Sequence, residues 1–153
     1  MPNLHFLIQR DNEIKKIWLN LVFKIKIMSE FVSISPFFIV ASLQSSLAFY
    51  VDKLGFEVQY AGPADGPYFA MIGRGPVSLM LKSSGEPVPN YARYYWAKWD
   101  AYITVTDPDA LFDEYRSAGV TFRRPLSDDT DNLRGFEVAD ADGYILFFGR
   151  PKA

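Results

Sequence analysis

The stretch DAYITVTDPDALFDEYRSAGV, residues 100–120, contains the pattern of a strand that leads directly into a helix. Its first seven residues alternate polar and apolar side chains, which is typical of a half-buried strand. Asp107 suits the N-cap of a helix and Pro108 suits the first helical position. Apolar residues then recur at helical spacing until Gly119, which can end the helix in the left-handed conformation. The stretch therefore predicts one β-α unit.

Three further strands are predicted after this unit. They are VTFRRP (120–125), GFEVAD (135–140) and YILFFG (144–149). The Asp-x-Asp-Gly run that begins at Asp140 resembles the start of a calcium loop. However, the twelfth position of such a loop falls on Pro151, which has no ligand atom where a bidentate Glu is needed. We therefore expect a hairpin turn here.

The same order of elements occurs earlier in the chain. A strand at 35–41 precedes a helix that Ser42 can cap and Gly55 can end. Three strands follow, at 56–61, 68–73 and 77–82. The pairs Ser35 and Asp100, Gly55 and Gly119, and Gly75 and Gly143 are separated by 65, 64 and 68 residues. We therefore predict an α+β fold of two βαβββ modules, at about 33–83 and 99–151, joined by a linker at 84–98.

Composition limits the function. With 153 residues, 49% hydrophobic and 16% aromatic, the chain fits one domain with a substantial core. A net charge of −2 gives no support to a nucleic-acid partner. The absence of cysteine excludes disulfides and thiolate sites and is compatible with a cytoplasmic location. The only histidine, His5, lies near the N-terminus, so a multi-histidine metal site is not expected.

Residues 1–32 differ in composition from the rest of the chain. Their apolar residues fit both a strand and one helical face, so periodicity does not decide between the two. Acidic residues and lysines exclude a signal peptide and a membrane span. A basic amphipathic membrane anchor stays an alternative. We favour an extension outside the domain, with Met28 as the natural beginning and no membrane partner.

Three motifs in sequence resemble a known superfamily. They are SLAFYVDKLGFEV (46–58), DPDALFDEYRSAGVTF (107–122) and GFEVADADGYILFFGRP (135–151). Together they look like the vicinal oxygen chelate superfamily, which includes glyoxalase I, extradiol dioxygenases and bleomycin-resistance proteins. The resemblance covers about residues 33–151. It implies two βαβββ modules whose mixed sheets curl around a cup, with helices on the outer face.

The resemblance also implies where a metal would be held. Catalytic members use His, Glu or Gln at the start of each module's first strand and within its last strand. These positions fall on Ser35 and Asp100, and near Leu79 and on Phe147. Divalent cations need carboxylate oxygens or imidazole nitrogens, and only Asp100 offers one. We therefore expect no metal and no other cofactor, which disfavours glyoxalase or dioxygenase chemistry.

A cup without a metal resembles the bleomycin-resistance branch, whose members bind a drug as dimers without turnover. We therefore expect a homodimer that sequesters an aromatic or cationic small molecule in an aromatic-lined cup. Strand alternation places Ser35, Phe37 and Ile39 on one face and Phe38 and Val40 on the other. The predicted ligand-binding residues are Phe37, Ile39, Trp96, Trp99, Asp100, Tyr102, Glu137 and Phe147.

Several alternatives stay open at this point. The aromatic residues suit a core or a dimer interface as well as a ligand site. The loop 126–132, with three aspartates, could attract a cationic ligand or be a solvated turn. The chain could be an enzyme with a degenerate metal site, or one that uses Asp100 and Glu137 as acid–base groups. It could also be an interaction module whose cup is filled by its own side chains.

Overall fold

The computed structural model describes residues 14–17 and 32–152. By its contacts the chain divides into two units, Met1–Val32 and Ser33–Ala153. In the first unit residues 14–17 are helical. The other predictions for residues 1–31, including those on His5 and Met28, lie outside the described residues. No helix within 14–17 or 32–152 has the length and apolar character needed to cross a membrane.

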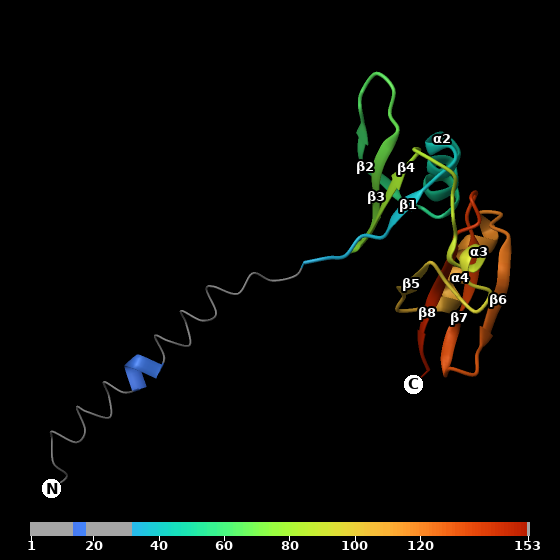
Figure 1. Ribbon diagram of the computed structural model, residues 1–153. Coiled ribbons are helices and arrows are strands. Elements are labelled where there is room, and N and C mark those ends of the chain that lie inside the picture. The colour runs from blue at the N-terminus through green and yellow to red at the C-terminus, as the bar shows by residue number, and fades with distance from the viewer. Residues whose placement is uncertain (1–13, 18–31, 153) are drawn as a thin grey trace, which may run out of the picture. The chain divides into compact units, whose positions relative to one another are not determined.

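The second unit contains two modules in chain order (Figure 1). The first module consists of β1 (Phe37–Ile39), α2 (Leu43–Leu47), the π-helix η1 (Ala48–Lys53), β2 (Glu57–Gly62), β3 (Phe69–Arg74) and β4 (Val77–Lys82). A short helix, α3 (Asn90–Arg93), lies between the two sheets in the sequence, in the segment 83–99 that we call the linker from here on. The second module consists of β5 (Ala101–Thr104), α4 (Pro108–Ser117), β6 (Phe122–Asp128), β7 (Leu133–Ala139) and β8 (Ile145–Pro151).

The two modules have the same sheet topology. The strand orders are β1-β4-β3-β2 and β5-β8-β7-β6. In each sheet the first pair is parallel and the others are antiparallel. Phe37 pairs with Met80 in the first sheet as Tyr102 pairs with Phe147 in the second. The predicted α+β fold of two βαβββ modules is confirmed.

Local signals begin and end the helices as the sequence predicts. The Ser42 hydroxyl accepts a hydrogen bond from the amide of Ser45 at the start of α2. Asp107 accepts from the amides of Asp109 and Ala110 at the start of α4. Gly119 ends this region with a φ of 71°, which favours glycine. Helical periodicity predicts one continuous helix after Ser42, whereas the structure widens it into a π-helix from Ala48.

The run Asp-Ala-Asp-Gly forms the β7–β8 hairpin turn, as predicted. One carboxylate oxygen of Asp140 accepts hydrogen bonds from the amides of Asp142 and Tyr144, at 2.9 and 2.8 Å. The other accepts from the Tyr50 hydroxyl at 2.7 Å, which links the turn to the first module. Burial raises the pKa of Asp140 and also the pKa of Tyr50. The turn therefore serves as a buried joint between the modules.

The two modules share one hydrophobic core on the helix-bearing faces of their sheets. Phe38 of β1 stacks on Tyr144 at a ring-centroid distance of 4.4 Å, and Tyr115 of α4 packs edge-on against Phe148 of β8. Phe38 and Val40 are buried in this core, as strand alternation predicts. The opposite face of each sheet is left to form a half-cup, which we call the first half-cup in the first module and the second half-cup in the second.

Candidate functional site

The first half-cup is an open, aromatic surface. Phe37 and Tyr60 are 50% and 56% exposed. The Phe69 ring lies 6.2 Å from Phe37 and 6.1 Å from Tyr60, measured between ring centroids. These rings border a cavity of ≈ 430 Å³, together with Gly62, Pro63, Tyr68 and Lys82. The surface can therefore receive a flat, apolar group.

Sequence reasoning identified only part of this wall. Phe37, one of the predicted ligand-binding residues, borders the cavity, and Ile39 lies on the same face, where it pairs with Lys82. Tyr60 and Phe69 were missed. The alternation within FEVQYA could not place Tyr60, because a β-bulge between Val58 and Tyr60 shifts the register of β2.

The second half-cup is filled by a side chain from the linker. Trp99 stacks on Phe147 with a ring-centroid distance of 4.5 Å and an interplanar angle of 23°. Tyr102 lies 5.1 Å from the same Phe147 ring, and the Arg124 guanidinium lies 5.5 Å from its centroid. Phe147 is fully buried as a result. Three predicted site residues, Trp99, Tyr102 and Phe147, are thus brought together.

Two glycines make room for the Phe147 ring. A Cβ atom placed on Gly135 of β7 would lie 2.5 Å from the ring, and one on Gly149 of β8 would lie 2.6 Å from it. Side chains cannot occupy such positions, so the ring can lie close to the sheet only where these strands carry glycine. The glycines were a signal in the sequence that the strand assignments did not use.

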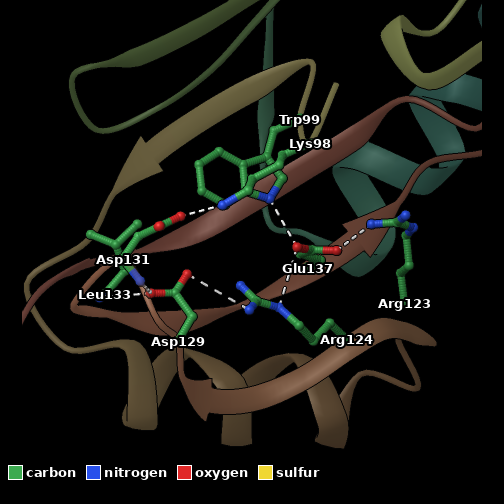
Figure 2. Close-up of polar contacts among 8 residues, drawn as sticks. All are labelled: Lys98, Trp99, Arg123, Arg124, Asp129, Asp131, Leu133 and Glu137. Carbon is green, nitrogen blue, oxygen red and sulfur yellow. Dashed lines mark hydrogen bonds and ion pairs between the residues drawn. The ribbon is translucent and has the colours of Figure 1, made fainter. Parts of the chain in front are cut away.

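Glu137 is the buried polar group of the second half-cup (Figure 2). The Trp99 indole donates its Nε1–H to one carboxylate oxygen at 2.9 Å. Arg123 forms an ion pair with the other oxygen. Arg124 Nε lies 3.2 Å from the first oxygen, in an ion pair without hydrogen-bond alignment. The Glu137 carboxylate is therefore contacted by two cations and one N–H donor.

The aspartates of the loop 126–132 are also paired (Figure 2). Asp129 accepts from the amide of Leu133 at 2.9 Å and lies 3.7 Å from an Arg124 nitrogen. Asp131 forms an ion pair with Lys98, and Lys98 donates a hydrogen bond to the same carboxylate. This hydrogen bond raises the pKa of Lys98. A cavity of ≈ 270 Å³ lies beside this network, bordered by Tyr95–Trp99, Arg123, Arg124, Asp129, Thr130 and Glu137.

Asp100 has both carboxylate oxygens occupied by backbone amides, whereas Trp96 is largely exposed and borders the cavity of ≈ 270 Å³. One oxygen of Asp100 accepts from the amide of Asn90 at 2.7 Å, and the other accepts from the amide of Ile145 at 2.8 Å. Its carboxylate therefore fastens the linker to β8. Trp96 is 67% exposed and stacks on Tyr94 at 5.0 Å in the linker.

The positions that hold a metal in catalytic members of the superfamily do not fit one here. Ser35 hydrogen-bonds to Ser78, and Asp100 is occupied as described. Leu79 is the wrong residue for the remaining position: it is buried in the core, and register assigns Met80 to the half-cup. Hydroxyl, thioether and phenyl groups do not form a site for a divalent catalytic cation. Within 14–17 and 32–152, no three His, Cys, Asp or Glu residues cluster as metal ligands.

Comparisons with known proteins agree with this architecture. One similar solved structure is that of a bleomycin-binding protein from Streptomyces verticillus in complex with copper(II)-bleomycin. It shares 26% sequence identity with this chain and has a TM-score of 0.63. The alignment covers 82% of this chain and 100% of that chain. Among curated proteins, no sequence matches.

Two other solved structures share the fold. TioX from Micromonospora sp. ML1 has 24% identity and a TM-score of 0.59, with 79% of this chain and 97% of that chain covered. TnmS3, an antibiotic binding protein from Streptomyces sp. CB03234, has 17% identity and a TM-score of 0.59, with 82% and 100% covered.

A family model described as the Glyoxalase/Bleomycin resistance protein/Dioxygenase superfamily matches residues 32–148. The match spans both modules, from before β1 into β8. The chain therefore belongs to this superfamily.

Proposed function

We propose that this protein binds a small aromatic molecule in the first half-cup, without a metal ion, and sequesters it without turnover. The observation that carries the proposal is the open wall of Phe37, Tyr60 and Phe69 around a cavity of ≈ 430 Å³. Flat rings stack on aromatic side chains at about 0.5–1.5 kcal/mol per contact, and cavities of this size suit small ligands.

The charges around the half-cups favour an aromatic ligand over a cationic one. Among the described residues, 14–17 and 32–152, those that border the cavity of the first half-cup include Lys82 and no carboxylate. In the second half-cup, Glu137 and Asp129 already face arginines, and Asp131 faces Lys98. A cation would therefore meet lysine in one half-cup and occupied carboxylates in the other.

The relatives support binding as the type of activity. One is a bleomycin-binding protein and another is an antibiotic binding protein. We extend only the general role, the capture of a small molecule, to this chain. The enzyme alternative has less support, because the carboxylate oxygens of Asp100 and Glu137 are occupied by backbone amides, Trp99 or arginines.

We also propose that the protein is a homodimer. Aromatic side chains are exposed both in the first half-cup and in the linker, where Tyr95 is 96% exposed. Such side chains are enriched at protein interfaces. Analytical ultracentrifugation should give a mass of twice 17.4 kDa. A monomer at all accessible concentrations would contradict this part of the proposal.

Calorimetric titration of the EDTA-treated protein tests the binding proposal. The probes are metal-free bleomycin and 2-naphthoate, a planar aromatic carboxylate that matches the rings and Lys82. We expect at least one probe to bind, and Phe37→Ala to weaken that binding about tenfold, since a lost stacking contact costs about 1.4 kcal/mol. The matched control is Ile34→Ala, which removes an apolar side chain that is 90% exposed and does not border the cavity.

Elemental analysis of the dialysed protein completes this test. Zinc, nickel, iron and manganese should each stay below about a tenth of an equivalent, because the required ligands are missing. One equivalent of a metal per half-cup, or binding of both probes only after metal is added, would overturn metal independence. Failure of both probes to bind would overturn the aromatic-ligand proposal.

A further inference from the structure

Trp99 covers the half-cup face of the second sheet, although it is not part of any strand of that sheet. It lies in the linker, one residue before Asp100, and its side chain stacks on β8. In the repeat, Ser35 corresponds to Asp100, so Ile34 corresponds to Trp99. Ile34 is 90% exposed and leaves its own half-cup open. The cover over the second half-cup is therefore a feature of this one side chain, not of the repeated architecture.

The Trp99 indole makes the contacts that a bound aromatic ligand would make. One of its faces lies on Phe147, and its edge meets Tyr102 at a ring-centroid distance of 5.7 Å. Its single polar atom donates to the buried Glu137 (Figure 2). A stacked ring combined with one directed hydrogen bond is the usual composition of a small-molecule site.

We infer that Trp99 is an internal ligand of the second half-cup, and that an external planar N–H-bearing heteroaromatic molecule binds there by displacing it. This inference rests on the proposed role of the protein in binding aromatic molecules. It assigns the second half-cup a ligand class of its own and makes Trp99 the residue that controls access.

The surroundings of Glu137 define this ligand class. Arg123 and Arg124 already place two positive charges at the carboxylate. Loss of the indole would leave one oxygen without its N–H donor, and an unpaired buried acceptor is costly. A neutral N–H donor restores the contact that Trp99 makes, whereas a cationic donor would add a third positive charge. The incoming ring must also be flat, because it has to stack on the Phe147 ring in place of Trp99. The Phe147 ring itself lies close to the strands at Gly135 and Gly149.

Trp99 can leave without rearrangement of the backbone. Asn90 donates its side-chain amide to the Trp99 carbonyl at 3.1 Å, and Asp100 fastens the next residue to Ile145. These contacts hold the main chain while the indole turns about its own side-chain bonds. The cavity of ≈ 270 Å³ that Trp99 borders gives an incoming molecule a place beside it.

Removal of the internal ligand provides the first test. Indole is titrated by calorimetry into wild type, Trp99→Ala and the control Tyr91→Ala, which removes a half-exposed ring from the linker that borders neither half-cup cavity. We expect Trp99→Ala to bind indole about tenfold more tightly than wild type, and Tyr91→Ala to match wild type. Benzofuran, which has the same shape without the N–H, should bind Trp99→Ala about tenfold more weakly than indole. Equal affinities for wild type and Trp99→Ala would overturn the inference.

Displacement in the wild-type protein provides the second test, which does not depend on how well the alanine variant folds. The protein is labelled with 5-fluorotryptophan, and the Trp99 resonance is assigned with Trp99→Phe. Saturating indole should move this ¹⁹F resonance to a solvent-exposed position with a solvent isotope shift. A Trp99 resonance that stays unchanged at saturating indole would overturn displacement.

The Phe37→Ala variant separates this inference from the proposed function. Both indole titrations are repeated in that background, where the wall of the first half-cup is reduced. The gain caused by Trp99→Ala should persist there, because Phe37 belongs to the other sheet. A gain that disappears would place the indole in the first half-cup and overturn the inference while the proposed function stands. Failure of the probes at the first half-cup, with the gain retained, would overturn only the proposed function.

Discussion

The two half-cups of this protein share a backbone plan and differ in their contents. Phe37, Met71 and Met80 of the first sheet correspond by register to Tyr102, Glu137 and Phe147 of the second. In the first sheet Phe37 is half exposed and Met71 and Met80 are partly exposed. In the second sheet Glu137 and Phe147 are buried. A repeated fold therefore sets where side chains are directed, but not whether the surface they form is open or filled.

The difference has a simple energetic meaning. Aromatic surface that is covered within the chain adds to stability at about 25 cal/mol per Å² of apolar area. Aromatic surface that stays exposed adds little until a ligand or a second subunit covers it. The second half-cup should therefore contribute mostly to folding, and the first mostly to binding.

The largest expected effect comes from the floor of the filled half-cup. Phe147→Ala should lower the free energy of unfolding by about 3–5 kcal/mol, as is usual for a fully buried phenylalanine. The matched change Met80→Ala, at the corresponding position of the open half-cup, should cost about 1–2 kcal/mol, because Met80 is only partly buried. Urea titration followed by circular dichroism measures both. Equal losses would mean that the two half-cups are equally filled in solution.

The next largest effect on stability is expected just before β1 and β5, the first strands of the two modules. Asp100→Ala should cost about 2–3 kcal/mol, because the amides of Asn90 and Ile145 lose a charged acceptor. Ser35→Ala removes only a hydroxyl contact with Ser78 and should cost about 0.5–1 kcal/mol. Thermal unfolding by calorimetry compares the two variants. A smaller loss for Asp100→Ala than for Ser35→Ala would contradict the structural role given to this carboxylate.

Much of this architecture could be predicted from local patterns. Caps at Ser42 and Asp107 and stops at Gly55 and Gly119 delimit the helices, and alternation along β1 assigns Phe38 to the core and Phe37 to the half-cup. These signals are short-range, because each depends on neighbouring backbone geometry. Such signals can therefore be identified in a single sequence.

Register in the last strand of the first module could not be predicted in the same way. The separation of 68 residues between Gly75 and Gly143 would align Leu79 with Phe147, whereas the strands pair so that Met80 is the counterpart. The turn between β3 and β4 is shorter than the turn between β7 and β8, so the offset changes between the glycines and the strands. A shift of one residue exchanges the two faces of a strand.

The contents of the second half-cup depend on contacts between distant segments. Trp99 and Glu137 were both assigned to a ligand site, but their hydrogen bond joins residues 38 positions apart. No local sequence pattern predicts that the Trp99 side chain occupies the second half-cup in place of a ligand. This depends on how the linker packs on the second sheet, which only the structure shows.

A smaller effect on stability tests whether the linker tryptophans have different roles. Trp99→Phe keeps a ring on Phe147 but removes the N–H that Glu137 accepts, so unfolding should become easier by about 1–2 kcal/mol. Trp96→Phe changes an exposed ring and should stay within about 0.5 kcal/mol of wild type. Guanidinium titration of both variants provides the measurement. A larger loss for Trp96→Phe would show that the linker is covered elsewhere, most directly by a second subunit.

The smallest effect on stability is expected in the wall of the open half-cup. Phe37→Ala should change the free energy of unfolding by less than about 1 kcal/mol, since half of the side chain is already in contact with solvent and its nearest ring partner, Phe69, lies 6.2 Å away. Urea titration of the ligand-free protein at low concentration measures this without a contribution from association. A loss of about 3 kcal/mol would instead place Phe37 in a buried core or a tight interface. A small loss of stability together with a tenfold loss of probe binding would separate the two half-cups by role, because a ring that folding barely needs would then be one that binding requires.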